Sequence, residues 1–391
     1  MRAAPPAKRP MCCQSARMRG SPPIGLSAPY VDETDDKAVL EVIHSGRLAF
    51  GPMTERFERL LAERVGAPHV AAVSSGTAGL HLGVKLAKIE PGDEVVTTPL
   101  SFIASANAIV YEGGVPVFVD VDERTLNLDP VAVEAAITPG TKAMMLVDLF
   151  GYPLEFDEFR ELARRHDLAI VEDACEALGA TYRGQPVGSF GHPAVFAFYP
   201  NKQVTTGEGG AVALGNEEDW ELVKALANQG RTDRGETFIH EHIGFNYRLD
   251  ELSAALGVAQ LSKLDRILSL RDRVAARYGE LLADLEGIRL LCPDDEIHTR
   301  SWFVYVVFIE PPAERAIVMA RLAAEGVASK PYLPAIHLQP AYRRRFGLSE
   351  GMFPVAEAAG ARGLALPFHT GLSEGDQERV VCALIRAIAS A

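Results

Sequence analysis

Short apolar runs alternate with helical segments over the first half of the chain. The runs are rich in Val and Ala and show little alternation of apolar and polar side chains, as expected for strands buried on both faces. The expected strands cover residues 69–73, 94–98, 115–119, 143–147 and 168–171. The helices expected between them cover residues 78–88, 104–111, 129–137 and 156–166. Helices of this length between strands imply crossovers, so the pattern predicts an α/β fold with a mostly parallel sheet.

The pattern also predicts how the chain divides into domains. Two amphipathic helices come first, one that Asp32 or Thr34 can cap and that ends at Ser45-Gly46, and one over residues 54–65. A long helical pattern over 249–285, interrupted near Asp265, is expected to connect to a second domain. That domain shows a strand over 302–309 and helices over 313–325 and 373–388. We therefore expect a large domain over 24–265 and a smaller α+β domain over 266–391.

The first 23 residues differ from the rest of the chain. They carry five basic side chains and no acidic one, and they lack the apolar centre of a secretory signal. We expect a disordered basic tail, or a start of translation at Met11 or Met18.

Composition excludes several classes of protein. The formal net charge of −13 among 391 residues, with no clustered basic patch, argues against a nucleic-acid-binding surface. No apolar run approaches the roughly 20 residues of a membrane-spanning helix. The 5 cysteines have no framework or metal-ligand spacing, so we expect reduced thiols, a cytoplasmic location and no metal.

Ser75-Gly76-Thr77 is the first candidate binding motif. It follows an expected strand and opens an expected helix, where free N–H groups, two hydroxyls and the helix dipole favour an anion. The sequence lacks the lysine of a Walker A loop and the three glycines of a dinucleotide-binding fingerprint. A simple helix cap or a site for one phosphate group are both consistent with it.

Two carboxylates, Glu172 and Asp173, end another expected strand. In doubly wound sheets ligands bind at this edge, and a carboxylate in a dry cleft needs a cation such as a protonated ring nitrogen. Phe102, also just after a strand, can offer a flat surface for stacking. Surface carboxylates and a core phenylalanine are the alternatives.

Lys202 lies between the apolar run ending at Pro200 and a glycine-rich turn at Gly207–Gly210. Taken alone it is a surface lysine. Together with a phosphate site, a flat aromatic ring and a buried acid, in this chain order, it matches the needs of pyridoxal 5′-phosphate. The lysine would form the Schiff base, and the acid would keep the pyridine nitrogen protonated.

The chain resembles the DegT/DnrJ/EryC1/StrS family of sugar aminotransferases from about Ile24 to its C-terminus. The matching stretches are SSGTA at 74–78, TPLSF at 98–102, EDACEALGA at 172–180, FYPNK at 198–202 with the turn up to Gly210, GFNYR at 244–248 and AIHLQP at 335–340. The resemblance implies the aspartate-aminotransferase (fold type I) architecture, with a seven-stranded sheet and a homodimer with shared active sites.

The resemblance also assigns roles to single residues. Lys202 would bind the cofactor and move a proton, and Asp173 would pair with the pyridine nitrogen. Phe102 would lie on the ring, and Ser75, Gly76 and Thr77 would form the phosphate site. Asn246 would reach the phosphate of the partner subunit. Weaker candidates for substrate binding are Arg231 and His337, for which solvation and a structural hydrogen bond are the respective alternatives.

Two positions depart from the family pattern. Ala197 stands where many members have a serine that binds the phosphate, so a hydrogen bond of roughly 1 kcal/mol would be absent or replaced. Glu176 stands where glutamine is common, beside the phenolic oxygen of the cofactor. An ionised carboxylate cannot donate, so Glu176 is protonated, turned to another donor, or absent from that role.

The resemblance implies an aminotransferase that moves an amino group, from L-glutamate as the expected donor, to a keto group of a nucleotide-linked deoxysugar in amino-sugar biosynthesis. Lys202 argues against the sister dehydratases, which have histidine there. The alternatives are transamination of a non-nucleotide cyclic ketone, aromatisation of an amino-shikimate-like ring, and a pyridoxal-phosphate-binding regulator without catalysis.

Overall fold

Seven strands form the central sheet of the computed structural model, which describes residues 22–232 and 239–391. Their order across the sheet is β1 (His69–Val73), β9 (Gly210–Leu214), β8 (Ala194–Ala197), β5 (Ala169–Asp173), β4 (Thr141–Val147), β2 (Glu94–Thr97) and β3 (Val115–Phe118). Of these, β9 runs antiparallel to both of its neighbours, and the pairs from β8 to β3 are parallel. The prediction of a seven-stranded, mostly parallel sheet is confirmed.

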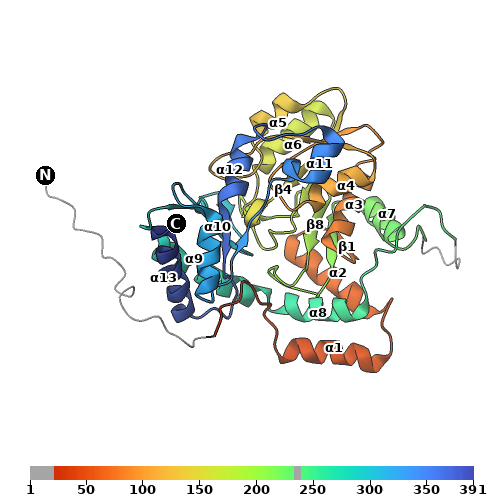
Figure 1. The fold of residues 1–391 in the computed structure, drawn as a ribbon. Coiled ribbons are helices and arrows are strands. Elements are labelled where there is room, and N and C mark those ends of the chain that lie inside the picture. Colours follow the sequence, from red (N-terminus) through yellow and green to blue (C-terminus); the bar gives the residue numbers. More distant parts are fainter. Residues whose placement is uncertain (1–21, 233–238) are drawn as a thin grey trace.

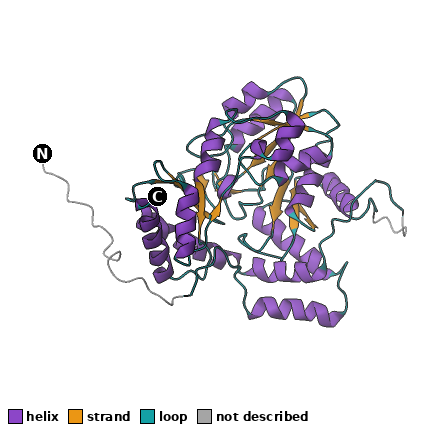
Figure 2. Ribbon diagram, viewed as in Figure 1, coloured by secondary structure: helices purple, strands orange, loops and turns teal. Residues whose placement is uncertain are grey.

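Helices cover both faces of this sheet (Figures 1 and 2). They are α2 (Pro52–Val65), α3 (Gly76–Leu86), α4 (Ala104–Tyr111), α5 (Pro130–Ala136), α6 (Phe156–His166) and α7 (Glu217–Ala227). Two more, α1 (Glu33–Ser45) and α8 (Glu251–Ser262), lie side by side below them in Figure 1. Asp32 caps α1, as one of the two expected alternatives.

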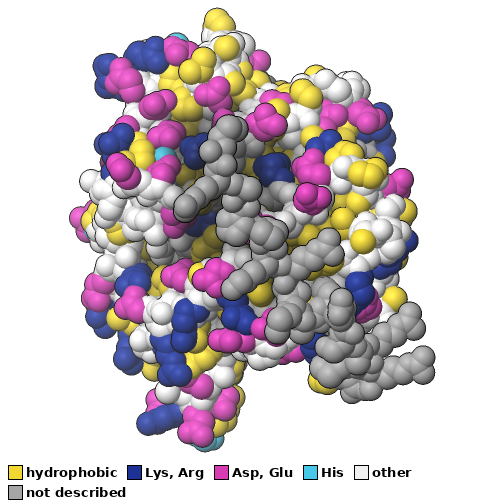
Figure 3. All heavy atoms as spheres, turned by 90° about the vertical axis from the view of Figure 1, so that its left-hand side faces the viewer, with side chains coloured by type: hydrophobic (Ala, Val, Ile, Leu, Met, Phe, Trp, Pro, Cys, Tyr) yellow, Lys and Arg dark blue, Asp and Glu magenta, His cyan; other side chains and the backbone are white. Residues whose placement is uncertain are grey.

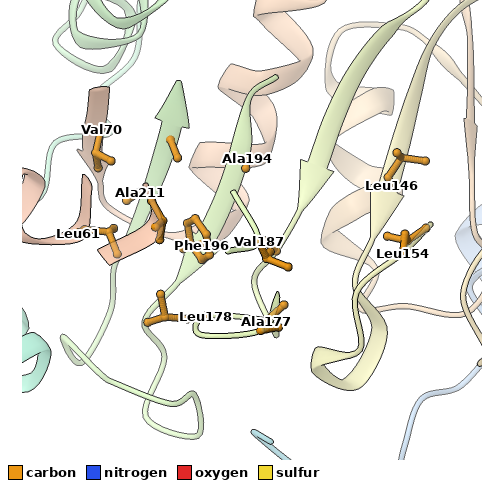
Figure 4. Close-up of a cluster of buried hydrophobic side chains, with 14 of the residues drawn as sticks. Leu61, Val70, Leu146, Leu154, Ala177, Leu178, Val187, Ala194, Phe196 and Ala211 are labelled. Carbon is orange, nitrogen blue, oxygen red and sulfur yellow. The ribbon is translucent and has the colours of Figure 1, made fainter. Parts of the chain in front are cut away.

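The two faces of the sheet bury different side chains of the same strands. In β1, Val70 and Ala72 pack in one cluster with Leu61 of α2, whereas Ala71 and Val73 pack in the other with Leu80 of α3. Figure 4 shows the first cluster, in which Phe196 and Ala211 of adjacent strands lie near Leu61. Because both faces are buried, the strands carry apolar residues at consecutive positions, which is the pattern seen in the sequence.

A smaller sheet is formed by strands that follow α9 (Leu264–Leu282) in the sequence. Its strand order is β10 (Ile288–Leu290), β12 (Tyr305–Ile309), β14 (Gly363–Leu366) and β13 (Lys330–Pro331). It is accompanied by α9 (Leu264–Leu282), α10 (Arg315–Ala324), α12 (Pro354–Arg362) and α13 (Glu374–Ala389). The long helical pattern is interrupted at Lys263, between α8 and α9, close to the expected boundary. A third, three-stranded sheet has the order β11 (His298–Thr299), β6 (Thr181–Tyr182) and β7 (Gln185–Pro186).

One late segment returns to the larger domain (Figure 1). It contains the short helices η2 (Ile336–Leu338) and α11 (Pro340–Phe346), beside α4. The Tyr342 hydroxyl donates to Asn107 Oδ1 of α4 at 2.8 Å, and the Ile336 N–H donates to the Pro99 carbonyl at 2.7 Å. This contact places residues after 335 next to the carboxyl end of β2.

Charged side chains of both signs are interspersed over the face shown in Figure 3. Within residues 22–232 and 239–391, no helix is long and apolar enough to cross a membrane, and no cluster of three or more His, Cys, Asp or Glu could hold a metal ion. The predicted basic tail lies outside the described residues except for its last two positions.

Candidate active site

Lys202 lies in the segment that follows β8, with its side chain only 13% exposed. Its Nζ is 3.8 Å from Glu176 Oε1 and 4.3 Å from the centroid of the Phe303 ring. Its backbone carbonyl accepts a 2.8 Å hydrogen bond from Arg271 of α9. Lys202 is therefore a largely enclosed amine, held against residues of α9 and of the segment before β12.

Asp173 is the last residue of β5 and is buried. Its Oδ2 accepts a 2.6 Å hydrogen bond from Ser105 Oγ, and its Oδ1 accepts one of 3.2 Å from the Cys175 N–H. Among the described residues, no Lys, Arg or His forms an ion pair with it. A buried carboxylate without a protein cation is costly, so this group is suited to a cation brought by a ligand.

The N-terminus of α3 is built from the predicted phosphate motif. Ser75 Oγ accepts a 3.1 Å hydrogen bond from the Ala78 N–H, so Ser75 is the helix cap. The N–H groups of Gly76 and Thr77 belong to the first turn, where an α-helix has no carbonyl partners for its donors. The motif is thus a cap that also presents two donors to an anion.

Glycines let this helix end approach strands β8 and β9. A Cβ on Gly76 would lie 2.7 Å from Ala197 Cβ and 3.0 Å from Cys175 Sγ. A Cβ on Gly210 would lie 2.4 Å from the Ser75 carbonyl oxygen. Only glycine fits at these two positions, and their packing holds the anion-binding turn beside the strands that precede and follow Lys202.

Phe102 stands beside Asp173 and is unusually exposed for its type, at 61%. Its carbonyl accepts a 3.2 Å hydrogen bond from Ser105 Oγ, the same hydroxyl that contacts Asp173. The ring is not part of a core cluster, so the alternative of a core phenylalanine is excluded. An exposed aromatic ring next to a buried acid can stack on a planar ligand.

Glu176 is turned to a backbone donor. Its buried carboxylate accepts a 2.8 Å hydrogen bond at Oε2 from the Phe150 N–H. Burial raises the pKa of Glu176, while the Lys202 charge and the Phe150 N–H oppose the rise. One oxygen of Glu176 is thus turned to another donor, which is one of the three alternatives for this residue.

The weaker candidates are His337 and Arg231. His337 is fully buried; its Nε2 lies 3.0 Å from Glu357 Oε1, and its ring packs edge-on against Phe353. This is the structural hydrogen bond weighed as its alternative. Arg231 is half-buried, and its backbone pairs with His240 next to residues 233–238, which the structure does not describe.

Asn246 is exposed. The carbonyl of its neighbour Tyr247 accepts a 2.7 Å hydrogen bond from the Ser74 N–H, so this segment lies against the phosphate motif of its own chain. The contact of Asn246 with a partner subunit stays a prediction.

Several residues of the site were not identified from the sequence. Ser105 is the hydroxyl donor to Asp173, and its position one helical turn after Phe102 was the available signal. Phe303 and Arg271 come from the distant C-terminal part of the chain, and no local pattern marks them. Arg271 is buried, which lowers its pKa to about 10, and it also donates to the Phe303 carbonyl at 3.1 Å.

These groups fit pyridoxal 5′-phosphate. The helix end can hold the phosphate, Asp173 the pyridine nitrogen and Phe102 one face of the ring, while Lys202 supplies the amine. The residue that departs most from the expected set is Ala197. Its methyl group packs against Gly76, so β8 contributes no hydroxyl at that point.

Comparison with known proteins agrees with this fit. Residues 29–385 match the model of the DegT/DnrJ/EryC1/StrS aminotransferase family. GDP-perosamine synthase of Caulobacter vibrioides is 40% identical over 94% of this chain and 99% of its own.

Solved structures of sugar aminotransferases have the same fold. The S. venezuelae protein DesV, in complex with a ketimine intermediate, has a TM-score of 0.87 and 36% identity over 94% of this chain and 98% of its own. A putative sugar aminotransferase of Streptococcus pneumoniae in its pyridoxamine-phosphate (PMP) form has a TM-score of 0.89 and 27% identity, covering 94% and 98% of the two chains. The chain belongs to the DegT/DnrJ/EryC1/StrS family and is a pyridoxal-phosphate-dependent aminotransferase.

Proposed function

We propose that this aminotransferase transfers an amino group from L-glutamate to the keto group of a nucleotide-linked deoxysugar. The observation that carries the chemistry is the position of Lys202 beside Glu176, together with a buried Asp173 that forms no ion pair with any described residue. The substrate class is supported by GDP-perosamine synthase, whose name contains a nucleotide-linked amino sugar. A GDP-linked keto sugar is therefore the first acceptor to test.

The residues of the chain have separate tasks in this proposal. When bound, pyridoxal phosphate supplies a ring that accepts electrons from the bond broken at Cα of the donor. Asp173 holds a proton on the ring nitrogen, and Gly76 and Thr77 bind the phosphate through their N–H groups. Phe102 orients the ring by stacking. Lys202 anchors the cofactor and, once released, moves the proton at Cα.

We also propose that the enzyme acts as a homodimer in the cytoplasm. Asn246 is exposed in the single chain and would contact the phosphate in the partner subunit. The test compares the wild-type protein with its Asn246→Ala variant. It measures the molar mass of each holoenzyme in solution and the affinity of each for the cofactor. A monomer that binds the cofactor normally would contradict it.

The decisive experiment follows the cofactor spectrum. The enzyme is converted to its amine form with L-glutamate and then mixed with nucleotide-linked 4-keto and 3-keto sugars and with cyclitol ketones. We expect the absorption of the aldehyde form to return with a nucleotide-linked sugar. A response to cyclitol ketones alone would favour the non-nucleotide alternative, and no conversion by glutamate would favour the regulator. The Lys202→Ala protein should lose activity by about 10⁴-fold or more, with no covalent attachment of the cofactor.

A further inference from the structure

Glu176 is held rigidly on one side. Its Oε2 accepts the 2.8 Å hydrogen bond from the Phe150 N–H, and its backbone carbonyl accepts one of 2.7 Å from Gln203 Nε2. Gln203 is itself buried and also lies 2.9 Å from Ser301 Oγ. These contacts leave Oε1 as the oxygen that faces Lys202.

Lys202 is held less tightly. Its Nζ lies 3.8 Å from Glu176 Oε1, which is within ion-pair range but longer than a hydrogen bond. The face of Phe303, 4.3 Å from Nζ, stabilises the ammonium form without accepting a proton. Among the described residues, Glu176 is the only carboxylate paired with this amine.

We propose that Glu176 is the proton partner of Lys202. In the cofactor-free protein, before Lys202 reacts, we place the proton on Nζ and the negative charge on Glu176. When the amine has to become a neutral nucleophile, Nζ first closes the 3.8 Å gap to hydrogen-bond distance; an N–H bond of Nζ then breaks and an O–H bond forms at Oε1. The pair keeps the same net charge, so no external acid or base is required.

The surroundings of Glu176 make this exchange possible. Among the described residues, the titratable groups that interact with it include Lys202, Asp173 at the end of β5, Cys175, and Tyr332 beside β13. Burial raises the pKa of the carboxyl, and the Asp173 charge acts in the same direction. The neutral acid is thus more accessible than on an exposed glutamate, whereas a glutamine at this position could not take up a proton.

The test uses the cofactor-free protein and needs no sugar substrate. Lys202 is methylated with formaldehyde and a borohydride reductant at a series of pH values, and the modified Lys202 peptide is quantified by mass spectrometry. Only the neutral amine reacts, so the pH profile reports its protonation. In Glu176→Gln the ammonium loses its anionic neighbour, so we expect the midpoint to fall by about one pH unit or more. At a fixed pH below the midpoint this is about a tenfold faster modification.

Two further variants make the result specific. Glu176→Asp keeps the charge and should restore most of the wild-type profile. Glu172→Gln removes another buried carboxylate of the same segment and should leave the profile unchanged. An unchanged profile in Glu176→Gln, in protein shown to be folded by circular dichroism, would overturn the proposal. The inference relies on Lys202 as the reactive amine, but it can fail or succeed independently of the sugar assigned above.

Discussion

Two carboxylates of one segment, Glu172 and Glu176, have buried side chains but lie at different distances from their nitrogen partners. Glu172 is fully buried in β5, and its Oε2 lies 2.7 Å from His192 Nε2. Glu176 lies 3.8 Å from Lys202 Nζ. The 2.7 Å contact of Glu172 is a full hydrogen bond, whereas the 3.8 Å separation between Glu176 and Lys202 Nζ lets Nζ turn to another group without breaking a hydrogen bond. The Glu172–His192 pair supports the fold, and the Glu176–Lys202 pair serves the chemistry.

Asp173, between them, represents a third situation. It has a hydroxyl and an N–H as donors and no protein cation among the described residues. Behind it lies Asp148, also fully buried, whose Oδ1 accepts a 3.1 Å hydrogen bond from the Leu154 N–H and whose Oδ2 has no described partner. Several acidic side chains therefore lie at this edge of the sheet, each with different hydrogen-bond partners.

Breaking the tight pair should have the largest effect. In His192→Ala, the buried carboxyl group of Glu172 loses its 2.7 Å partner, which should lower the free energy of unfolding by about 3–5 kcal/mol. Chemical denaturation followed by circular dichroism measures this. Adding Glu172→Gln to the same protein should recover part of the loss, because the uncompensated charge is removed. His166→Ala, which removes an exposed ion pair with Glu134, should change stability little. Equal losses in both histidine variants would contradict the distinction.

A smaller effect is expected at Asp173. Ser105→Ala removes the 2.6 Å hydrogen bond to Oδ2, and a bond to a charged group contributes about 1.5–3 kcal/mol. We expect this decrease in the unfolding free energy of the cofactor-free protein. The matched control is Ser101→Ala, because the Ser101 hydroxyl lies 3.1 Å from Ser105 Oγ but, in the described part of the chain, forms no hydrogen bond with the Asp173 carboxylate. A loss as large in the control would assign the effect to packing.

A dependence on pH is expected at Asp148, small near the unfolded pKa and growing as pH rises. Burial, and then the Glu172 charge, raise the pKa of Asp148 well above its usual range. A carboxyl with a raised pKa in the folded state contributes stability at low pH that is lost as pH rises from the unfolded pKa towards the folded one. Asp148→Asn removes this loss. The variant should therefore gain stability over the wild type as pH increases, by at most about 1.4 kcal/mol per pH unit. A difference that is constant from pH 5 to pH 8 would be inconsistent with a protonated Asp148.

Local patterns predicted the elements that lie near one another in sequence. Doubly buried strands such as β1 and β4 have continuous apolar runs, and the helix α1 has a clear cap and terminator. The sequence therefore predicted these strands and this helix. The helices α7, α11 and α12 and the short strands β6, β7 and β11 were not predicted. They depend on contacts with distant segments, as α11 does on α4 through Tyr342 and Asn107.

The departure at Glu176 shows the limit of reading single positions. The sequence left three alternatives for its carboxyl group, and the deciding partner is the Phe150 N–H, which lies elsewhere in the chain. His337 is similar, because its buried contact with Glu357 is a tertiary one. Neither contact leaves a periodic signal in the sequence.

By itself, the sequence determined the α/β class, the family and the order of the cofactor-binding motifs, because these depend on residue type and on short-range spacing. The tertiary structure decided which oxygen of Glu176 faces Lys202, which hydroxyl contacts Asp173, and that Phe303 and Arg271 contact the lysine from a distant part of the chain. The physical reason is that burial and charge pairing depend on groups that come together only when the chain folds. Those contacts, more than the identity of any one residue, set where a proton can move.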